Sequence, residues 1–173
     1  MQVVKGTAVY TANFAPPNAP VTAITNTSLL VNGTNAGIID NAEMNDLETV
    51  GNAQISTTQS KFGGSSISFD GTGDFLINNS PSASLYAFGT GDFTIEMWVW
   101  LDSTSSSSRL ITNRQPLGGS NGTWGVNFTG TVISFTEVIS GEPGVAATGL
   151  TLVNAWHHLA ITRTGTTLRI FVD

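Results

Sequence analysis

The chain has 173 residues, of which 40% are hydrophobic and only 10% charged, and a formal net charge of −6 at pH 7. The length fits one domain, and a surface built from Ser, Thr, Asn and Gly favours short strands and polar turns over long helices. The acidic balance without a basic run argues against nucleic-acid binding, no apolar stretch approaches the roughly 20 residues of a membrane span, and the lack of Cys excludes disulfides and thiolate metal sites.

The first 27 residues differ from the rest of the chain in their pattern of apolar residues, prolines and turn residues. Apolar positions within residues 1–14 predict one or two strands. Residues 15–27 are predicted to be a connector, because Pro16-Pro17 and Pro20 favour extended, polyproline-like chain. From residue 28 to residue 173, turn residues recur at the spacing typical of a β-sandwich or jelly roll.

Ten short strands are predicted in this second part. In chain order they are Ser28–Val31, Ala53–Ser56, Ser65–Phe69, Phe75–Ile77, Phe93–Leu101, Arg109–Thr112, Trp124–Phe128, Val132–Phe135, Asn154–Arg163 and Leu168–Val172. Residues 32–52 are predicted to be irregular, with one helical turn over Ala42–Leu47. Asp70-Gly71-Thr72-Gly73 and Gly165-Thr166 have the chemistry of hairpin turns.

The strongest strand pattern is that of residues 93–101, which has a period of two. One face carries Ile95, Met97, Val99 and Leu101, and the other carries Glu96, Trp98 and Trp100. Because both faces are largely apolar, this strand is expected to lie in the centre of its sheet.

Four segments resemble motifs of the laminin-G-like, concanavalin A-like jelly rolls. They are FDGTGDFL at residues 69–76, GDFTIEMWV at 91–99, NAWHHLAITR at 154–163 and LRIFVD at 168–173. They occur in the family's order, and the resemblance covers about residues 28–173. It implies an all-β fold, an antiparallel two-sheet β-sandwich of the concanavalin A-like jelly-roll type. It is strongest to the members found in structural proteins of marine bacteriophages.

Two departures from the family pattern concern the two ends of the chain. Residues 4–17 resemble the family's C-terminal tail, and the strands that normally follow the last matched motif are missing. The resemblance therefore implies a slice of a tandem array. Residues 1–14, through the assembly candidates Val4, Val9, Tyr10 and Phe14, would fill the gap in the same molecule or in a neighbouring copy. The alternative is that the chain is a fragment of a longer protein.

The carboxylates do not form the pattern of a glycoside hydrolase. Retaining enzymes of that kind place two carboxyl groups about 5 Å apart, but the comparable strand here offers only Glu96. Glu137 and Glu142 belong to a later hairpin. No Gly-x-Ser-x-Gly motif accompanies the two His residues, and His158 is expected to pack beside Trp156 with a ring nitrogen bonded to backbone. No catalytic residue is predicted.

Two loops are candidates for calcium binding, because they collect the carboxylate and amide oxygens that Ca²⁺ prefers. The candidates are Asp40 and Asn41 in the first loop, and Asp70 and Asp74 in the second. Since Asp and Asn are also ordinary turn residues, a structural role is the competing interpretation. No other cofactor is predicted.

The Trp side chains are candidates for stacking on sugar rings. Trp98, Trp100 and Trp124 are the candidate ligand-binding residues, and Trp100 and Trp124 are expected to be the exposed pair. Core packing is the competing interpretation.

These observations predict a non-catalytic structural or adhesive module of a virion or other extracellular assembly. Its partners would be copies of itself or neighbouring assembly proteins, and in addition a cell-surface glycan. The alternative is a carbohydrate-binding module of a secreted or surface protein, and a glycoside hydrolase comes third.

Overall fold

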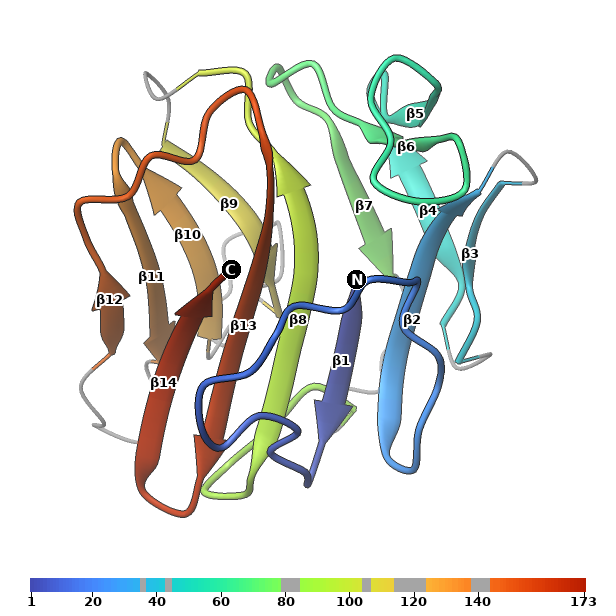
Figure 1. Cartoon of the computed structure of the whole chain (residues 1–173). Coiled ribbons are helices and arrows are strands. Elements are labelled where there is room, and N and C mark those ends of the chain that lie inside the picture. The colour runs from blue at the N-terminus through green and yellow to red at the C-terminus, as the bar shows by residue number, and fades with distance from the viewer. Residues whose placement is uncertain (35–36, 43–44, 79–84, 104–106, 114–123, 138–143) are drawn as a thin grey trace.

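The computed structural model describes residues 1–34, 37–42, 45–78, 85–103, 107–113, 124–137 and 144–173 (Figure 1). All its regular elements in these ranges are β-strands. They are β1 (Gln2–Lys5), β2 (Thr27–Thr34), β3 (Gly37–Asp40), β4 (Leu47–Val50), β5 (Gln54–Ser56), β6 (Ser66–Ser68), β7 (Phe75–Asn78), β8 (Phe93–Trp100), β9 (Ser107–Thr112), β10 (Trp124–Thr129), β11 (Val132–Glu137), β12 (Val145–Ala147), β13 (Trp156–Thr164) and β14 (Thr167–Val172). No helix in the described ranges could cross a membrane.

The strands form two main sheets. A six-stranded sheet has the order β14-β13-β8-β1-β2-β3, and a four-stranded sheet has the order β12-β11-β10-β9. Two further pairs, β4-β7 and β5-β6, complete the described strands. All ladders are antiparallel, and Figure 1 shows the two main sheets as separate layers. The predicted all-β sandwich is therefore confirmed.

One hydrophobic core joins the two main sheets. Ile95 of β8 and Leu159 of β13 are fully buried in it, as is Phe135 of β11 from the other layer. The period of two predicted for β8 holds, since Met97 lies in the same core and Val99 and Leu101 pack against it. Burial of each large apolar side chain contributes roughly 1.5–3 kcal/mol to folding.

The N-terminal strand β1 lies in the middle of the six-stranded sheet. Val3 pairs with Ile95 of β8 on one side and with Leu29 of β2 on the other, and Val3 and Val4 are both fully buried. Residues 2–5 thus form a strand in their own molecule's sheet. The interpretation that residues 1–14 replace missing strands of the family stays a prediction. Exchange of this segment between copies stays a prediction.

Three strands were not predicted, namely β3, β4 and β12. All lie in stretches where polar residues or glycine interrupt the pattern, and β3 lies at a sheet edge, where less of a strand is buried. Of the helical turn predicted over Ala42–Leu47, residues 43–44 lie outside the described part, and Leu47 begins β4 instead.

The two predicted hairpin turns had different outcomes. Gly165-Thr166 closes the β13–β14 hairpin, with Thr164 opposite Thr167 and a φ of 57° at Gly165. The prediction of a hairpin turn at residues 70–73 is wrong, because the flanking strands do not pair with each other: β6 pairs with β5, and β7 pairs with β4. The turn chemistry is nevertheless present, since Asp70 Oδ1 accepts a hydrogen bond of 2.7 Å from the Thr72 backbone N–H.

Candidate functional site

The six-stranded sheet has an inner face on the core and an outer face directed away from it. Strand alternation assigns to the outer face the side chains that lie between the core positions. They include Gln2 and Val4 of β1, Thr94, Glu96, Trp98 and Trp100 of β8, Trp156, His158, Ala160 and Thr162 of β13, and Arg169 and Phe171 of β14.

Residues 7–24, here called the strap, cross this outer face and are anchored to it by hydrogen bonds. Thr94 Oγ1 accepts a hydrogen bond of 2.8 Å from the Val9 backbone N–H and donates one of 3.1 Å to the Thr7 carbonyl. Thr162 Oγ1 donates 2.9 Å to the Tyr10 carbonyl. The sequence forms no strand here; instead, buried threonine hydroxyls of the sheet satisfy the strap backbone.

Aromatic rings hold the middle of the strap. Tyr10 stacks on Phe14 with ring centroids 3.6 Å apart. Phe14 in turn makes T-shaped contacts with His158 and Phe171, with ring centroids 5.7 Å and 5.3 Å apart. Val9, Tyr10 and Phe14, predicted as assembly residues, therefore lie on the outer face of their own chain, and Val9 remains 36% exposed.

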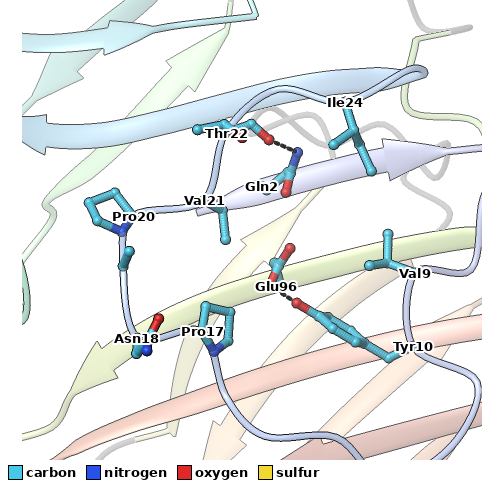
Figure 2. Close-up of a pocket in the computed structure, with 11 residues that line it drawn as sticks. Gln2, Val9, Tyr10, Pro17, Asn18, Pro20, Val21, Thr22, Ile24 and Glu96 are labelled. Carbon is cyan, nitrogen blue, oxygen red and sulfur yellow. Dashed lines mark hydrogen bonds between the residues drawn. The ribbon is translucent and has the colours of Figure 1, made fainter.

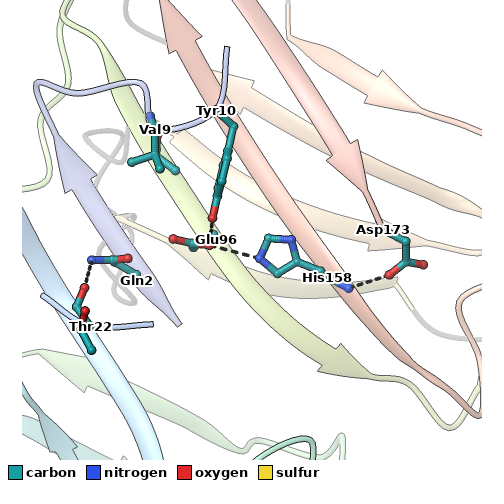
Figure 3. Close-up of polar contacts among 8 residues, drawn as sticks. Gln2, Val9, Tyr10, Thr22, Glu96, His158 and Asp173 are labelled. Carbon is teal, nitrogen blue, oxygen red and sulfur yellow. Dashed lines mark hydrogen bonds and ion pairs between the residues drawn. The ribbon is translucent and has the colours of Figure 1, made fainter. Parts of the chain in front are cut away.

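A buried polar triad lies beneath the strap. Glu96 Oε2 accepts hydrogen bonds from the Tyr10 hydroxyl at 2.8 Å and from His158 Nε2 at 3.1 Å (Figure 3). Glu96 is 2% exposed and His158 1% exposed. Since a carboxylate only accepts, Nε2 carries the proton of His158. Burial, the hydrogen bond to Glu96 and the Glu96 charge raise the pKa of Tyr10 well above its ordinary value.

The triad corrects the expectation for His158. Its ring nitrogen binds a carboxylate rather than backbone, and its ring centroid lies 5.2 Å from that of Trp98. The adjacent His157 instead bonds the Asp173 side chain through Nδ1. The sequence did contain a signal for such a contact, because a Glu on a strand with two apolar faces is buried and needs hydrogen-bond partners.

A pocket of about 300 Å³ lies between the strap and the sheet, beside the triad (Figure 2). Its wall is mostly apolar and is formed by Val9, Pro17, Ala19, Pro20, Val21 and Ile24. Gln2 and Glu96 reach it from neighbouring strands, where they are paired in register. Gln2 Nε2 donates to the Thr22 carbonyl at 3.2 Å and so holds the far end of the strap.

The predicted sugar-stacking Trp residues do not form one surface. Trp124 is 3% exposed and stacks between Phe88 and Phe135, so the prediction that it is exposed is wrong. Trp98 is half-buried under Lys61, whose Nζ lies 3.9 Å from its ring centroid.

Trp100 is partly exposed and has Trp156 as its aromatic neighbour. It lies opposite Trp156 in the β8–β13 register, with ring centroids 6.0 Å apart. Its Nε1 donates 3.0 Å to Asp102 Oδ1. Both Trp rings are partly exposed. The outer face therefore has a Trp100–Trp156 pair at one end of β8.

The acidic loop residues bind mainly backbone. Asp40 Oδ1 accepts from the Leu30 N–H at 2.7 Å, while Asn41 is exposed. Asp74 accepts from the backbone N–H groups of Asn52 and Asp70, each at 2.6 Å. Within the described ranges, no three His, Asp or Glu side chains gather as a metal site would require. Calcium binding stays a prediction.

Glu137 does not form a catalytic pair with Glu96, because it is bound to Arg163 on the other side of the sheet. Glu137 Oε2 accepts 3.0 Å from Arg163 Nη1, and both side chains are 6% exposed. Arg163 stands over the core residue Phe93, on the opposite face of the sheet from Glu96. Glu142 lies outside the described residues.

The fold and the outer face together define a concanavalin A-like β-sandwich domain. A family model described as the concanavalin A-like lectin/glucanases superfamily matches residues 69–173, more than half of the chain. The chain belongs to this superfamily. The match begins at Phe69, so β1–β6 and the strap lie outside it. No curated protein and no solved structure gives a significant match.

Proposed function

We propose that this chain is a non-catalytic structural or adhesive module of a virion or other extracellular assembly. The observation that supports it is the strap, in which the chain's own residues 7–24 cover the outer face over Thr94, Glu96 and Thr162. This part of the face carries a network of hydrogen bonds and stacked rings, which stiffens the module.

The chemistry of Glu96 supports the non-catalytic part of the proposal. Both hydrogen bonds to its Oε2 come from partners that are themselves held in place. Among the residues that line the described pocket, Glu96 is the one carboxylate. A retaining mechanism needs a second carboxyl group about 5 Å away.

The test combines light scattering, electron microscopy and a hydrolysis assay on soluble glucans. The expected result is a defined self-assembly or co-assembly with no sugar release. A strictly monomeric particle that binds no partner would contradict the assembly role, and measurable hydrolysis lost in Glu96→Gln would contradict the non-catalytic role.

A carbohydrate-binding module is the second candidate, and the Trp100–Trp156 pair favours it. Two partly exposed indole rings in register, with Asp102 beside them, offer aromatic faces and a hydrogen-bond acceptor to a sugar. On a glycan array, selective binding that is lost in Trp100→Ala would support this candidate. The matched control is Trp98→Ala, whose ring lies under Lys61; equal loss in both variants would count against a site at Trp100.

A further inference from the structure

Two oxygen atoms at the floor of the pocket have no hydrogen-bond partner. Gln2 Nε2 donates to the Thr22 carbonyl and to Thr27 Oγ1, and since a carbonyl only accepts, the amide orientation is fixed. Glu96 Oε2 is occupied by Tyr10 and His158. In the described part of the chain, this leaves Gln2 Oε1 and Glu96 Oε1 without a donor.

These two oxygens are accessible, although their residues are almost fully buried. Gln2 is 3% exposed and Glu96 2% exposed. Neither oxygen belongs to the sealed polar atoms without partners in the described chain, which are on Trp98, His157, His158 and Thr164. Figures 2 and 3 show the two side-chain ends directed towards each other across the β1–β8 ladder. Both therefore face the pocket.

The chemistry of the pocket is complementary to a ligand that donates hydrogen bonds and carries positive charge. Two adjacent acceptors, one of them charged, are costly to leave without a donor. The described residues that line the pocket include no Lys or Arg. The N-terminal amino group of Met1 interacts electrostatically with Glu96, but burial lowers its pKa to about 6, so it carries little positive charge at pH 7. Opposite the acceptors, Pro17, Pro20 and Val21 offer an apolar wall, which suits a short aliphatic stem better than water.

We propose that this pocket binds a primary ammonium group on a short aliphatic stem. The ammonium group, with three donors and no acceptor, lies between Glu96 Oε1 and Gln2 Oε1, and the stem lies along the proline wall. The ligand is a free alkylamine or a Lys side chain presented by another protein chain. The site is separate from the Trp100–Trp156 pair and does not depend on the assembly role.

Calorimetric titration with n-butylammonium and with Nα-acetyl-lysine methylamide tests the proposal, with n-butanol and glucose as neutral comparisons. Both ammonium compounds, or n-butylammonium alone, are expected to bind and to shift the amide resonances of Gln2 and Val21. Binding of both points to a Lys side chain, and binding of n-butylammonium alone points to a free amine. Equal binding of n-butanol or glucose, or no binding of either ammonium compound, would overturn the proposal.

Two variants separate the site from the fold. Glu96→Gln removes the charge and is expected to weaken ammonium binding by about tenfold or more. Because Glu96 also holds Tyr10 and His158, a second variant leaves it intact. Val21→Lys adds an ammonium group to the pocket wall and is expected to abolish binding of the added amine.

The matched control is Ile39→Lys, which makes the same change of charge at a 55% exposed position of β3 that does not line the pocket. It is expected to bind n-butylammonium as the unsubstituted protein does. Unchanged binding in folded Val21→Lys would overturn the proposal even if Glu96→Gln fails to fold.

Discussion

The Tyr10 hydroxyl donates a 2.8 Å hydrogen bond to Glu96 Oε2 and so joins two residues that lie 86 positions apart in the chain. The strap and the central strand β8 meet at this bond. Because Glu96 is buried, the bond satisfies a charge that water does not reach freely.

Tyr10→Phe tests this contact. The variant keeps the stack on Phe14 but removes one donor to a buried carboxylate, and we expect a loss of about 1–3 kcal/mol in the free energy of unfolding. Urea denaturation measures the loss, and limited proteolysis within residues 11–24 is expected to become faster. Tyr86→Phe is the control, because its hydroxyl bonds Asn45 away from the strap. Faster strap cleavage in both variants would contradict a local role for Tyr10.

We expect both tyrosines of the chain to ionise at a higher pH than ordinary tyrosines do. Burial first, followed by the hydrogen bond to Glu96 and its charge, raises the pKa of Tyr10 well above the ordinary 10. Burial is the main cause that raises the pKa of Tyr86 to about 12. The ultraviolet absorbance of tyrosinate is therefore expected to stay low in the folded protein at pH 10, where half of ordinary tyrosines ionise.

The sign of the linked stability change follows from the same shifts. The folded state holds these two protons more tightly than the unfolded state does, so the stabilisation is complete below pH 10. The contribution of Tyr86 is lost as the pH rises through about 12, its folded pKa, and that of Tyr10 is lost at higher pH. Urea denaturation at increasing pH measures this slope. A tyrosinate signal with a midpoint at pH 10 in the folded protein would contradict the prediction.

Arg163 and Glu137 provide a test of a buried ion pair. Arg163 Nη1 donates to Glu137 Oε2 at 3.0 Å, and its Nε donates to the Gly91 carbonyl at 2.9 Å. Arg163→Met leaves a buried carboxylate uncompensated and is expected to cost about 3–5 kcal/mol in the free energy of unfolding. The double variant with Glu137→Leu is expected to recover part of this loss. A double-mutant cycle without coupling would contradict the prediction.

Gly51 is a backbone position where a side chain does not fit. Its φ is 72°, and a Cβ atom there would collide with Asp74 Oδ1, which holds the Asn52 N–H. Gly71, with a φ of 83° and open space around it, is the matched control. Both Ala variants are strained by about 1–2 kcal/mol, and Gly51→Ala is expected to lose more because Asp74 must move. Equal shifts in thermal denaturation would contradict this.

The strands that sequence reasoning placed best are those with a local signal. The two faces of β8 follow from alternation over residues 93–101, and the faces of β13 follow in the same way. The exposure of Trp124 could not be derived, because its burial depends on Phe88 and Phe135, which reach it from other segments. The local sequence pattern around Trp124 carries no information about these contacts with distant segments.

The candidate site was harder to predict for the same reason. Glu96 was identified as a single carboxylate, and Tyr10 and His158 were each noted for other roles. Only the pairing of β8 with β13 and the path of the strap bring the three side chains together. Long-range pairing of this kind follows from the global free-energy minimum rather than from any one segment.

The central place of β1 also has a kinetic consequence. β1 precedes its partner strand β8, which includes Ile95, in the chain, and until β8 is synthesised the partner available to β1 in this sheet is β2. A two-stranded ladder alone is marginally stable in water, and closure over so long a loop makes folding slow. During that delay, a β1 strand from a second chain would compete for the same position. We therefore expect refolding from dilute solution to give the self-contained molecule, and the predicted exchange to be favoured only where nascent chains are crowded.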